Sequence, residues 1–268
     1  MKQLFNISSG AEQSGDLLLC ELSHYHICLA GAHAAGAINW LQYYEKATPL
    51  TRADLVQLLQ QEAIYPKSFK SLLIGSAFPD ATLVPSGLAA EKDLGSFLNQ
   101  QADVPVFTDE IEGQDVQVVY AIPAHFYNIL SEGGNATTMH VHTAALRAQE
   151  TDANNYMLLH FASREFRVVA VKEGQVQLAQ VYPFTAPLDV VYYLLMISAE
   201  YNLPQSETTV YLSGLVDASS ALYKELYQYY TKVQFAADAP FSLPQNDYQQ
   251  HFFSSIFNLA ACASSVVS

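Results

Sequence analysis

The sequence predicts an α/β protein of two similar lobes, each a mixed β-sheet with helices on its faces. The main observation is that one order of elements, three strands followed by helix, strand and helix, occurs twice along the 268 residues. Between the two runs, the polar stretch 149–155 lacks periodic apolar residues, as a domain boundary does. Half of the residues are hydrophobic, which is enough for a sizeable core. We therefore expect a first lobe at residues 1–150 and a second at 151–268.

The first half opens with a predicted antiparallel meander of three strands. Its segments are rich in Leu, Ile, Tyr and Trp and are separated by His24-Tyr25 and by small residues around Gly36. A helix follows, because Thr51 precedes Asp54 with capping-box spacing and apolar residues recur on one helical face. The expected elements are strands at 17–23, 26–32 and 37–44, a helix at 51–63 and a strand at 68–74.

The rest of the first half mixes extended and helical patterns. Val84 precedes a proline and so favours an extended backbone over 81–85. Leu94, Phe97 and Leu98 share one helical face. The expected elements are a helix at 88–101, a strand at 116–122, a short helix at 124–130 and a strand at 139–144.

The same order of elements then starts again, so that each lobe is expected to hold a five-stranded mixed sheet. Lys172-Glu173-Gly174 is a tight-turn sequence between two strands. The helix that starts near Pro187 is apolar nearly all round, so we expect it at the junction between the lobes. The expected elements are strands at 156–162, 166–171 and 175–182, a helix at 188–201, a strand at 209–215, a helix up to Tyr230, a strand at 232–236 and a helix at 248–263.

The charge balance excludes nucleic acid as a partner. The chain has 26 acidic and 12 basic residues, a formal net charge of −14, which repels a phosphate backbone. The first ten residues carry one lysine and no apolar core, so no export signal is indicated. The densest apolar run, Val190 to Ile197, is too short to cross a membrane. We expect a cytoplasmic location with no membrane contact.

The three cysteines favour a reducing compartment. Cys20, Cys28 and Cys262 have neither the even count of a disulfide framework nor the spacing of a zinc or redox site. All three lie among apolar neighbours in the sequence. We therefore expect free, buried thiols.

The repeated order of elements resembles the duplicated ribonuclease H-like motif of the actin-like ATPase superfamily, which also contains sugar kinases and chaperone ATPases. More narrowly, four segments in their order resemble a Bacteroidetes family with no established activity, domain-of-unknown-function family 3822. The segments are Tyr65 to Pro85, Tyr182-Pro183-Phe184 leading into 189–195, Val210 to Gly214 and Phe257 to Cys262. The resemblance implies an actin-like ATPase fold and leaves the function unknown.

The resemblance also implies where nucleotide would bind, and the sequence departs from that pattern. ATPases of the superfamily end the first strand of each half with an Asp and follow it with a glycine-bearing hairpin, because carboxylate oxygens suit Mg²⁺ and glycine lets the backbone approach a phosphate. The corresponding segments here, 20–24 and 160–164, contain neither. The glycine pair near the adenosine survives only as Ser213-Gly214. ATP with Mg²⁺ is therefore not supported as a cofactor, and an active enzyme is disfavoured.

A cleft between the lobes stays a candidate site for some other ligand. The residues expected to line it come from the two hairpins and from the end of the fourth strand of the second half. They are Glu21, Ser23, His24, Ser163, Arg164, Ser213 and Gly214.

Two histidines form a weak metal-site pattern. His140 and His142 lie two apart in a predicted strand, so both rings would face one side. No third ligand lies near them in the sequence, and the alternative is a half-buried polar face. We expect no metal site.

Two segments are candidate partner surfaces. An acidic segment suits the steering of a basic partner, and its alternative is a solvated face. A tyrosine-rich helix suits anchoring, because tyrosine offers large contact area with a polar tip, and its alternative is core packing. The residues are Asp109, Glu110, Glu112 and Asp115 in the first segment and Tyr223, Tyr227 and Tyr230 in the second.

These observations lead to a functional hypothesis with two competitors. The expected function is a non-catalytic scaffold or protein-binding role for a degenerate actin-like ATPase fold, with an unknown protein partner and with a homodimer left open. The first competitor is a divergent ATPase or phosphotransferase that uses Glu21, Arg164 and Gly214. The second is a small-molecule sensor whose lobes close on a ligand.

Overall fold

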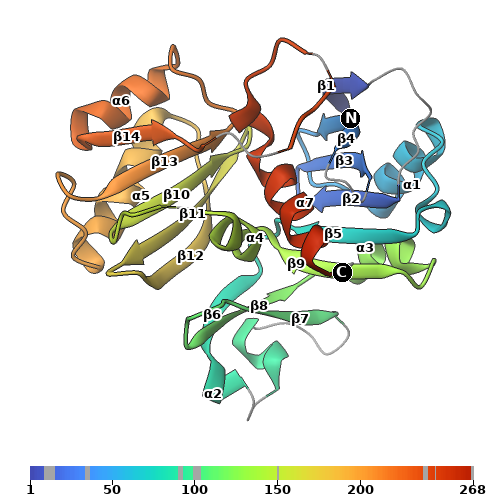
Figure 1. The fold of residues 1–268 in the computed structure, drawn as a ribbon, viewed down its shortest axis with the longest axis horizontal. Helices are drawn as coiled ribbons and strands as arrows, with labels where there is room; N and C mark the ends of the chain where they lie inside the picture. The colour runs from blue at the N-terminus through green and yellow to red at the C-terminus, as the bar shows by residue number, and fades with distance from the viewer. Residues whose placement is uncertain are drawn as a thin grey trace.

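The protein is described by a computed structural model that covers residues 1–8, 16–33, 37–89, 93–98, 104–149, 151–237, 241–244 and 246–266. Figure 1 shows two lobes side by side, with two helices between them and a small third sheet below. The two large sheets have six and five strands, and the small sheet has three. The expected two-lobed α/β architecture is therefore confirmed.

The first sheet has the strand order β1-β4-β3-β2-β5-β9. The predicted meander is present, and β5 and β9 add to it in parallel. The sequence analysis missed β1, which pairs antiparallel with β4 at the sheet edge and makes this sheet six-stranded rather than five-stranded. The strands are β1 (Lys2–Ser8), β2 (Leu17–Leu22), β3 (His26–Ala32), β4 (Ile38–Glu45), β5 (Ser71–Ser76) and β9 (Ala136–His140).

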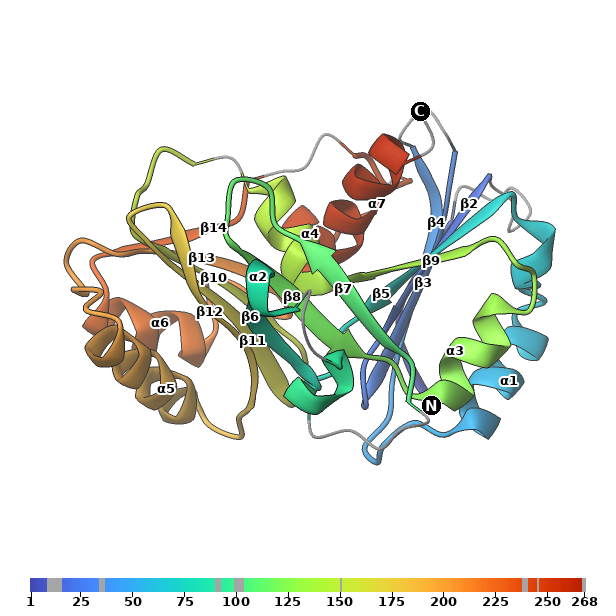
Figure 2. The same cartoon turned by 90° about the horizontal axis from the view of Figure 1, so that it is seen from below.

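Helices α1 (Arg52–Gln61) and α3 (Ala124–Ser131) cover one face of the first sheet (Figure 2). The predicted capping box of α1 is present, since Thr51 Oγ1 accepts from the Asp54 amide while the Asp54 carboxylate accepts from the Thr51 amide. The buried side chains of both helices join Cys20, Leu22 and Ile74 in one core. This core is the main source of stability for the first lobe.

A small sheet is inserted between β5 and α3, and the sequence analysis did not predict it as a sheet of its own. Its strands β6 (Ala81–Pro85), β7 (Val106–Glu110) and β8 (Val116–Ala121) are all antiparallel. The helix predicted at 88–101 is largely wrong, because the chain forms α2 (Ser86–Ala89) and a 3₁₀ turn η2 (Leu94–Leu98) there. The parts of that prediction at 90–92 and 99–101 lie outside the described residues.

The strand predicted at 139–144 is also wrong in its second half. The strand β9 ends at His140, and α4 (Val141–Ala148) begins at once. The His140 ring caps the helix, because its Nδ1 accepts from the amide of His142. An apolar run shared by a strand and a helix has no visible boundary in the sequence.

The second sheet has the order β12-β11-β10-β13-β14, five strands as predicted. Three antiparallel strands are followed by two parallel ones, the same arrangement as β4-β3-β2-β5-β9 of the first sheet. The elements are β10 (Tyr156–Phe161), β11 (Glu165–Lys172), β12 (Gln175–Pro183), α5 (Pro187–Glu200), β13 (Thr209–Gly214), α6 (Ala221–Tyr229) and β14 (Lys232–Phe235).

The helices between the lobes are not the ones predicted. We expected α5 at the junction, but α5 and α6 pack side by side on the face of the second sheet that points away from α4 (Figure 2). The junction is instead occupied by α4 and by α7 (Ser254–Val266), which follows the 3₁₀ turn η3 (Gln250–Phe253). Although α7 lies in the C-terminal half, it packs against the first sheet. Its sequence shares the apolar character of α5, which is why composition alone assigned the junction to the wrong helix.

The two lobes are joined by a continuous core and not by hinge helices alone. Val169 and Val176 of the second sheet pack in the same cluster as Tyr120 of the small sheet. Nearby, the side chain of Gln114 donates to the Gly174 carbonyl and accepts from the Val176 amide. The small sheet therefore clamps the first lobe to the second.

All three cysteines are buried, as expected, and Cys20 and Cys28 are free thiols. No helix within the described ranges is both long enough and apolar enough to span a bilayer.

Candidate functional site

A buried ion pair joins the two lobes where the hairpins meet. Glu21, near the end of β2, accepts from Arg167 Nη1 of β11 and from His26 Nε2 of β3, both at 3.0 Å. The exposed fractions of Glu21, His26 and Arg167 are 2%, 3% and 6%. Burial would raise the pKa of Glu21, but the Arg167 charge and the His26 hydrogen bond hold this pKa well below its ordinary value. Glu21 is therefore a carboxylate that Arg167 neutralises from the other lobe.

Ser23 supports this interlobe ion pair from the first hairpin. Its hydroxyl oxygen lies 2.8 Å from His26 Nδ1 and accepts from the amides of Tyr25 and His26. The His26 ring also stacks on Tyr43. These contacts fix the His26 ring so that Nε2 points at Glu21. The role of Ser23 is therefore to position His26.

The two hairpins form a shallow pocket of about 440 Å³, which we call the hairpin pocket. Ser163 and Arg164 line it from the second lobe, and Tyr25 lines it from the first. The Ser163 hydroxyl donates to the Glu45 carboxylate and so bridges the lobes a second time. His24, predicted to line the same cleft, instead packs edge-on against Phe78.

Gly214 has a structural reason to be glycine. Its φ is +78°, and a Cβ atom there would lie 2.2 Å from the carbonyl oxygen of Phe161. The close approach of β13 to β10 therefore requires a residue without a side chain. The seven predicted cleft residues thus fall in separate places: Glu21 and Ser23 at the ion pair, Ser163 and Arg164 in the hairpin pocket, His24 and Gly214 in packing contacts, and Ser213 in the cavity described next.

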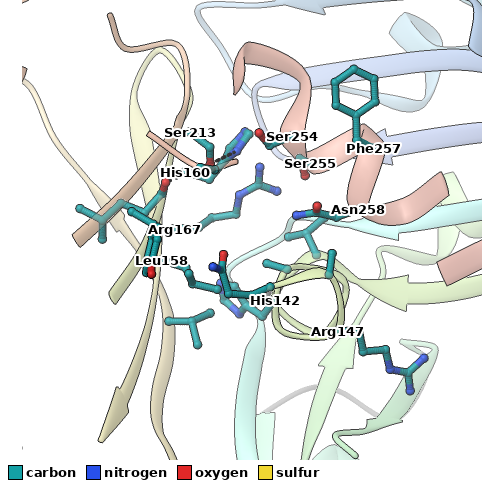
Figure 3. Close-up of a pocket in the computed structure, with 18 of the residues that line it drawn as sticks. His142, Arg147, Leu158, His160, Arg167, Ser213, Ser254, Ser255, Phe257 and Asn258 are labelled. Carbon is teal, nitrogen blue, oxygen red and sulfur yellow. Dashed lines mark hydrogen bonds between the residues drawn. The ribbon is translucent and has the colours of Figure 1, made fainter. Parts of the chain in front are cut away.

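A larger cavity of about 520 Å³, the interlobe cavity, lies between the second sheet and the helices α4 and α7. Figure 3 shows the Arg167 guanidinium projecting into it toward Ser255 and Asn258 of α7. His142 of α4 and His160 of β10 also line it. The sequence analysis missed Arg167 and His160 as site residues. A usable signal was present for Arg167, which is a charged residue inside the otherwise apolar strand 166–171.

Two arginines line this cavity, of which Arg167 projects into it while Arg147 is directed away from it (Figure 3), and the histidines around it are held neutral. Burial, with the nearby Arg167 charge, lowers the pKa of His160 and of His142 well below the ordinary value. His140 is also affected, since burial lowers its pKa to about 4. Its ring is fully used, with Nε2 donating to the Phe78 carbonyl and Nδ1 capping α4. The two histidines of the metal-site pattern therefore differ in environment, and no group of three or more metal-ligating side chains exists among the described residues.

Two of the predicted partner-surface residues are buried. Asp109 is only 7% exposed, accepts from the Tyr120 hydroxyl and the His140 amide, and has its pKa raised by burial. Tyr230 is fully buried and shares a hydrogen bond with Ser198 of α5. Both predictions of surface exposure are wrong, because a strand and a helix alternate buried and exposed positions within a segment of one character.

The other members of these segments lie at the surface. Glu110, Glu112 and Asp115 are exposed around the turn between β7 and β8. Tyr227 is 49% exposed, and Tyr223 is half-buried against Phe235.

The chain matches one family model over residues 27–233, more than half of its length. The model is described as "Protein of unknown function (DUF3822)". A search of the curated proteins found no match.

Two solved structures resemble this fold over nearly the whole chain. One is a protein with actin-like ATPase fold and unknown function from Bacteroides thetaiotaomicron, with a TM-score of 0.71 and 18% identity over 92% of this chain and 96% of that one. The other is the PilM-PilN type IV pilus biogenesis complex, with a TM-score of 0.66 and 12% identity over 93% and 98%. The chain therefore belongs to the DUF3822 family and has the actin-like ATPase fold.

Proposed function

We propose that this protein is a non-catalytic member of the actin-like ATPase fold that binds a protein partner through the outer face of its second lobe. The observation that carries the proposal is a row of apolar side chains on α5, which we call the α5 stripe. Leu188, Tyr192 and Met196 are four residues apart and are 59%, 60% and 52% exposed. Residues at this spacing lie along one helical face, so the stripe is continuous.

The neighbouring helix carries further exposed tyrosines. Tyr227 and Tyr229 of α6 are 49% and 38% exposed, so that α5 and α6 carry five of the nine large apolar side chains exposed in the described residues. Contiguous exposed apolar side chains mark interaction sites in monomeric proteins. Tyrosine and methionine are also enriched at the cores of protein interfaces.

The interlobe ion pair supports a non-catalytic role. In ATPases of this fold, the first strand of each half ends at the metal and the phosphates. Here Glu21 at that strand end is neutralised by Arg167 and held by His26 at 3.0 Å. The small-sheet clamp at Gln114 adds a further contact that opposes the separation of the lobes. A nucleotide would have to displace a buried, fully paired carboxylate.

Two further observations favour a different protein over a second copy as the partner. The net charge of −14 makes two copies repel one another, whereas a less acidic protein is attracted. The related fold of PilM was solved as a complex with PilN, so the fold can hold a protein partner. Exposed Glu110, Glu112 and Asp115 would add to the long-range attraction of a basic protein.

The partner is testable with variants of the α5 stripe. Photocrosslinking residues at positions 192 and 196 should identify one protein from native extract, which is then purified and titrated against the chain. Tyr192→Gln with Met196→Gln should weaken binding about tenfold or more, because the apolar contact is lost. Tyr65→Gln is the matched control, since Tyr65 is 56% exposed but lies in the first lobe. Unchanged affinity of the double variant would contradict the proposal.

The non-catalytic part is tested by melting the protein with ATP and Mg²⁺. A ligand at 100 times its Kd stabilises by about 2.7 kcal/mol, which raises the midpoint by several degrees. We expect no Mg²⁺-dependent rise at millimolar ATP. A rise that Arg164→Ala abolishes would favour the divergent ATPase or phosphotransferase instead, since Arg164 is exposed in the hairpin pocket.

A further inference from the structure

The interlobe cavity has the size of a small-molecule site. Its volume of about 520 Å³ falls in the range of roughly 300–1,000 Å³ that ligand pockets occupy. Protein interiors are otherwise close-packed, with few voids larger than a water molecule. Apolar side chains such as Leu158, Val169 and Phe257 line one part of it, and Ser254, Ser255 and Asn258 line another.

Buried hydrogen-bonding groups in this cavity lack partners. Arg167 is 6% exposed, and its Nη2 has no hydrogen-bond partner, although Nη1 pairs with Glu21. His142 is 2% exposed, and neither of its ring nitrogens meets hydrogen-bond geometry with any group, the nearby Gln180 backbone included. Buried polar groups of folded proteins are nearly always satisfied, so exceptions call for a bound group. Figure 3 shows both side chains facing the space between β10, β11 and α7.

His160 supplies the opposite kind of group, an acceptor. The Ser213 hydroxyl donates to the Leu159 carbonyl at 3.0 Å, so it must accept the 3.0 Å contact from His160 Nδ1. The His160 ring is neutral, so a proton on Nδ1 leaves Nε2 with a free lone pair. The cavity therefore offers donors at Arg167 and an acceptor at His160.

The charge of the cavity selects an anion of low charge. Within the described lining there is one cation that faces inward, Arg167, and no carboxylate. Glu21 already neutralises part of the Arg167 charge from the other lobe. Counting Glu21, a bound monocarboxylate brings the sum of charges around Arg167 to −1 and a dianion such as phosphate brings it to −2, so the site disfavours the dianion more strongly, while Nη2 is open to donate to one carboxylate oxygen.

We propose that the interlobe cavity binds a small monocarboxylate with an apolar body and a hydroxyl or N–H donor. The carboxylate accepts from Arg167 Nη2, the donor group hydrogen-bonds His160 Nε2, and the body packs against Leu158 and Val169. This site is separate from the α5 stripe, which lies on the opposite face of the second sheet.

Isothermal titration calorimetry with the full chain tests the ligand class. The probes are 4-hydroxybenzoate and 3-(4-hydroxyphenyl)propanoate, which place the two polar groups at different separations. At least one should bind with 1:1 stoichiometry, and its uncharged amide should bind about tenfold or more weakly. Inorganic phosphate should not compete. Absence of saturable binding by both acids at millimolar concentration, or equal affinity for the amide, would overturn the proposal.

Two variants locate the binding. Ala145→Phe fills the cavity from α4 and leaves the ion pair untouched, so it should abolish binding while Ala221→Phe, on the exposed start of α6, should not. Arg167→Lys keeps a cation beside Glu21 but removes Nη2, and should weaken the acid about tenfold while hardly affecting the amide. If Ala145→Phe fails to fold, Ser255→Leu serves the same purpose. Full affinity in both the filled variant and Arg167→Lys would place the ligand elsewhere and refute the site.

Discussion

The two faces of the second sheet depart in opposite ways from the usual arrangement of apolar side chains inside and charged side chains outside. The inner face, toward α4 and α7, buries Arg167 with the interlobe ion pair and half-buries the ring of His160. The outer face is covered by α5 and α6, whose far sides leave Leu188, Tyr192 and Met196 in contact with solvent. Charge is buried where the lobes meet, and apolar surface is exposed where no described segment of the chain covers it.

The two faces should respond differently to substitution. The inner face depends on protonation and on exact pairing, because a buried charge without its partner is costly. The outer face costs the free protein little, since an exposed apolar side chain is common and its removal changes few contacts. Substitutions on the inner face should therefore lower the free energy of unfolding. Substitutions on the outer face should leave it nearly unchanged and should instead weaken the binding of a partner.

Acid should have the largest effect, and it should act on the inner face. The pKa values of His140, His142 and His160 are lowered in the folded chain, so the unfolded chain binds protons first as the pH falls below about 6.5. Stability is therefore present above pH 6.5 and lost below it. Each histidine contributes about 1.4 kcal/mol per pH unit, or about 4 kcal/mol per unit together, down to its own folded pKa. Glu21, with its lowered pKa, adds a further loss below about pH 4.5.

Urea unfolding between pH 4.5 and 7.5 measures this slope, and His142→Phe is the control. The His142 ring makes no hydrogen bond, so the apolar replacement should be tolerated at pH 7. It should reduce the acid slope by about 1.4 kcal/mol per pH unit. A slope identical to that of the natural chain would mean that His142 does not titrate on unfolding.

The interlobe ion pair should give the next largest effect. Arg167→Met leaves the Glu21 carboxylate buried without its cation, which should cost about 3–5 kcal/mol. Adding Glu21→Gln removes that charge while keeping an acceptor for His26, so the double variant should be more stable than Arg167→Met alone. A double variant that is less stable than either single variant would show that the pair is not the coupling between the lobes.

The third largest loss of stability should come from a substitution of Gly214, where β13 closely approaches β10. Gly214→Ala places a Cβ atom 2.2 Å from the Phe161 carbonyl oxygen at a φ of +78°, so backbone strain of roughly 1–3 kcal/mol adds to a steric clash. Gly174→Ala is the matched control, because its φ is +74° and no atom lies within 4 Å of its Cβ position. The difference in melting temperature between the two variants measures the cost of the steric clash alone. Equal costs would mean that β10 moves aside and that the contact with Phe161 does not require a glycine at position 214.

Local patterns in the sequence predicted most of the second lobe and the meander of the first. Thr51 and Asp54 form the capping box that their spacing predicts, and Glu173-Gly174 forms the turn between β11 and β12. These features are decided within a few residues, so they are readable from one chain. The insertion was not, because β7 is short and half-buried, although Gly113, with a φ of +74°, marks the turn between β7 and β8.

The candidate site depended on contacts that no local pattern encodes. Glu21 and Arg167 lie 146 residues apart, and only the closing of the lobes makes them partners. Asp109 and Tyr230 were assigned to the surface from the character of their segments, but each lies on the buried side of its element. The apolar character of α5 was visible in the sequence, whereas the face of α5 that is covered depends on how α5 packs on the second sheet and against α6.

The smallest effect on the stability of the free protein should come from the outer face, where exposed and buried residues of one helix can be compared directly. Each of the single variants Leu188→Gln, Tyr192→Gln and Met196→Gln should change the free energy of unfolding by no more than about 0.5 kcal/mol, because these side chains are more than half exposed. Leu194→Gln changes a fully buried side chain on the opposite face of the same helix and should cost about 2–5 kcal/mol. Urea unfolding with light scattering measures both quantities on the same samples. A large loss of stability in the stripe variants, with a change in molecular mass, would show that a second copy of the chain already covers α5.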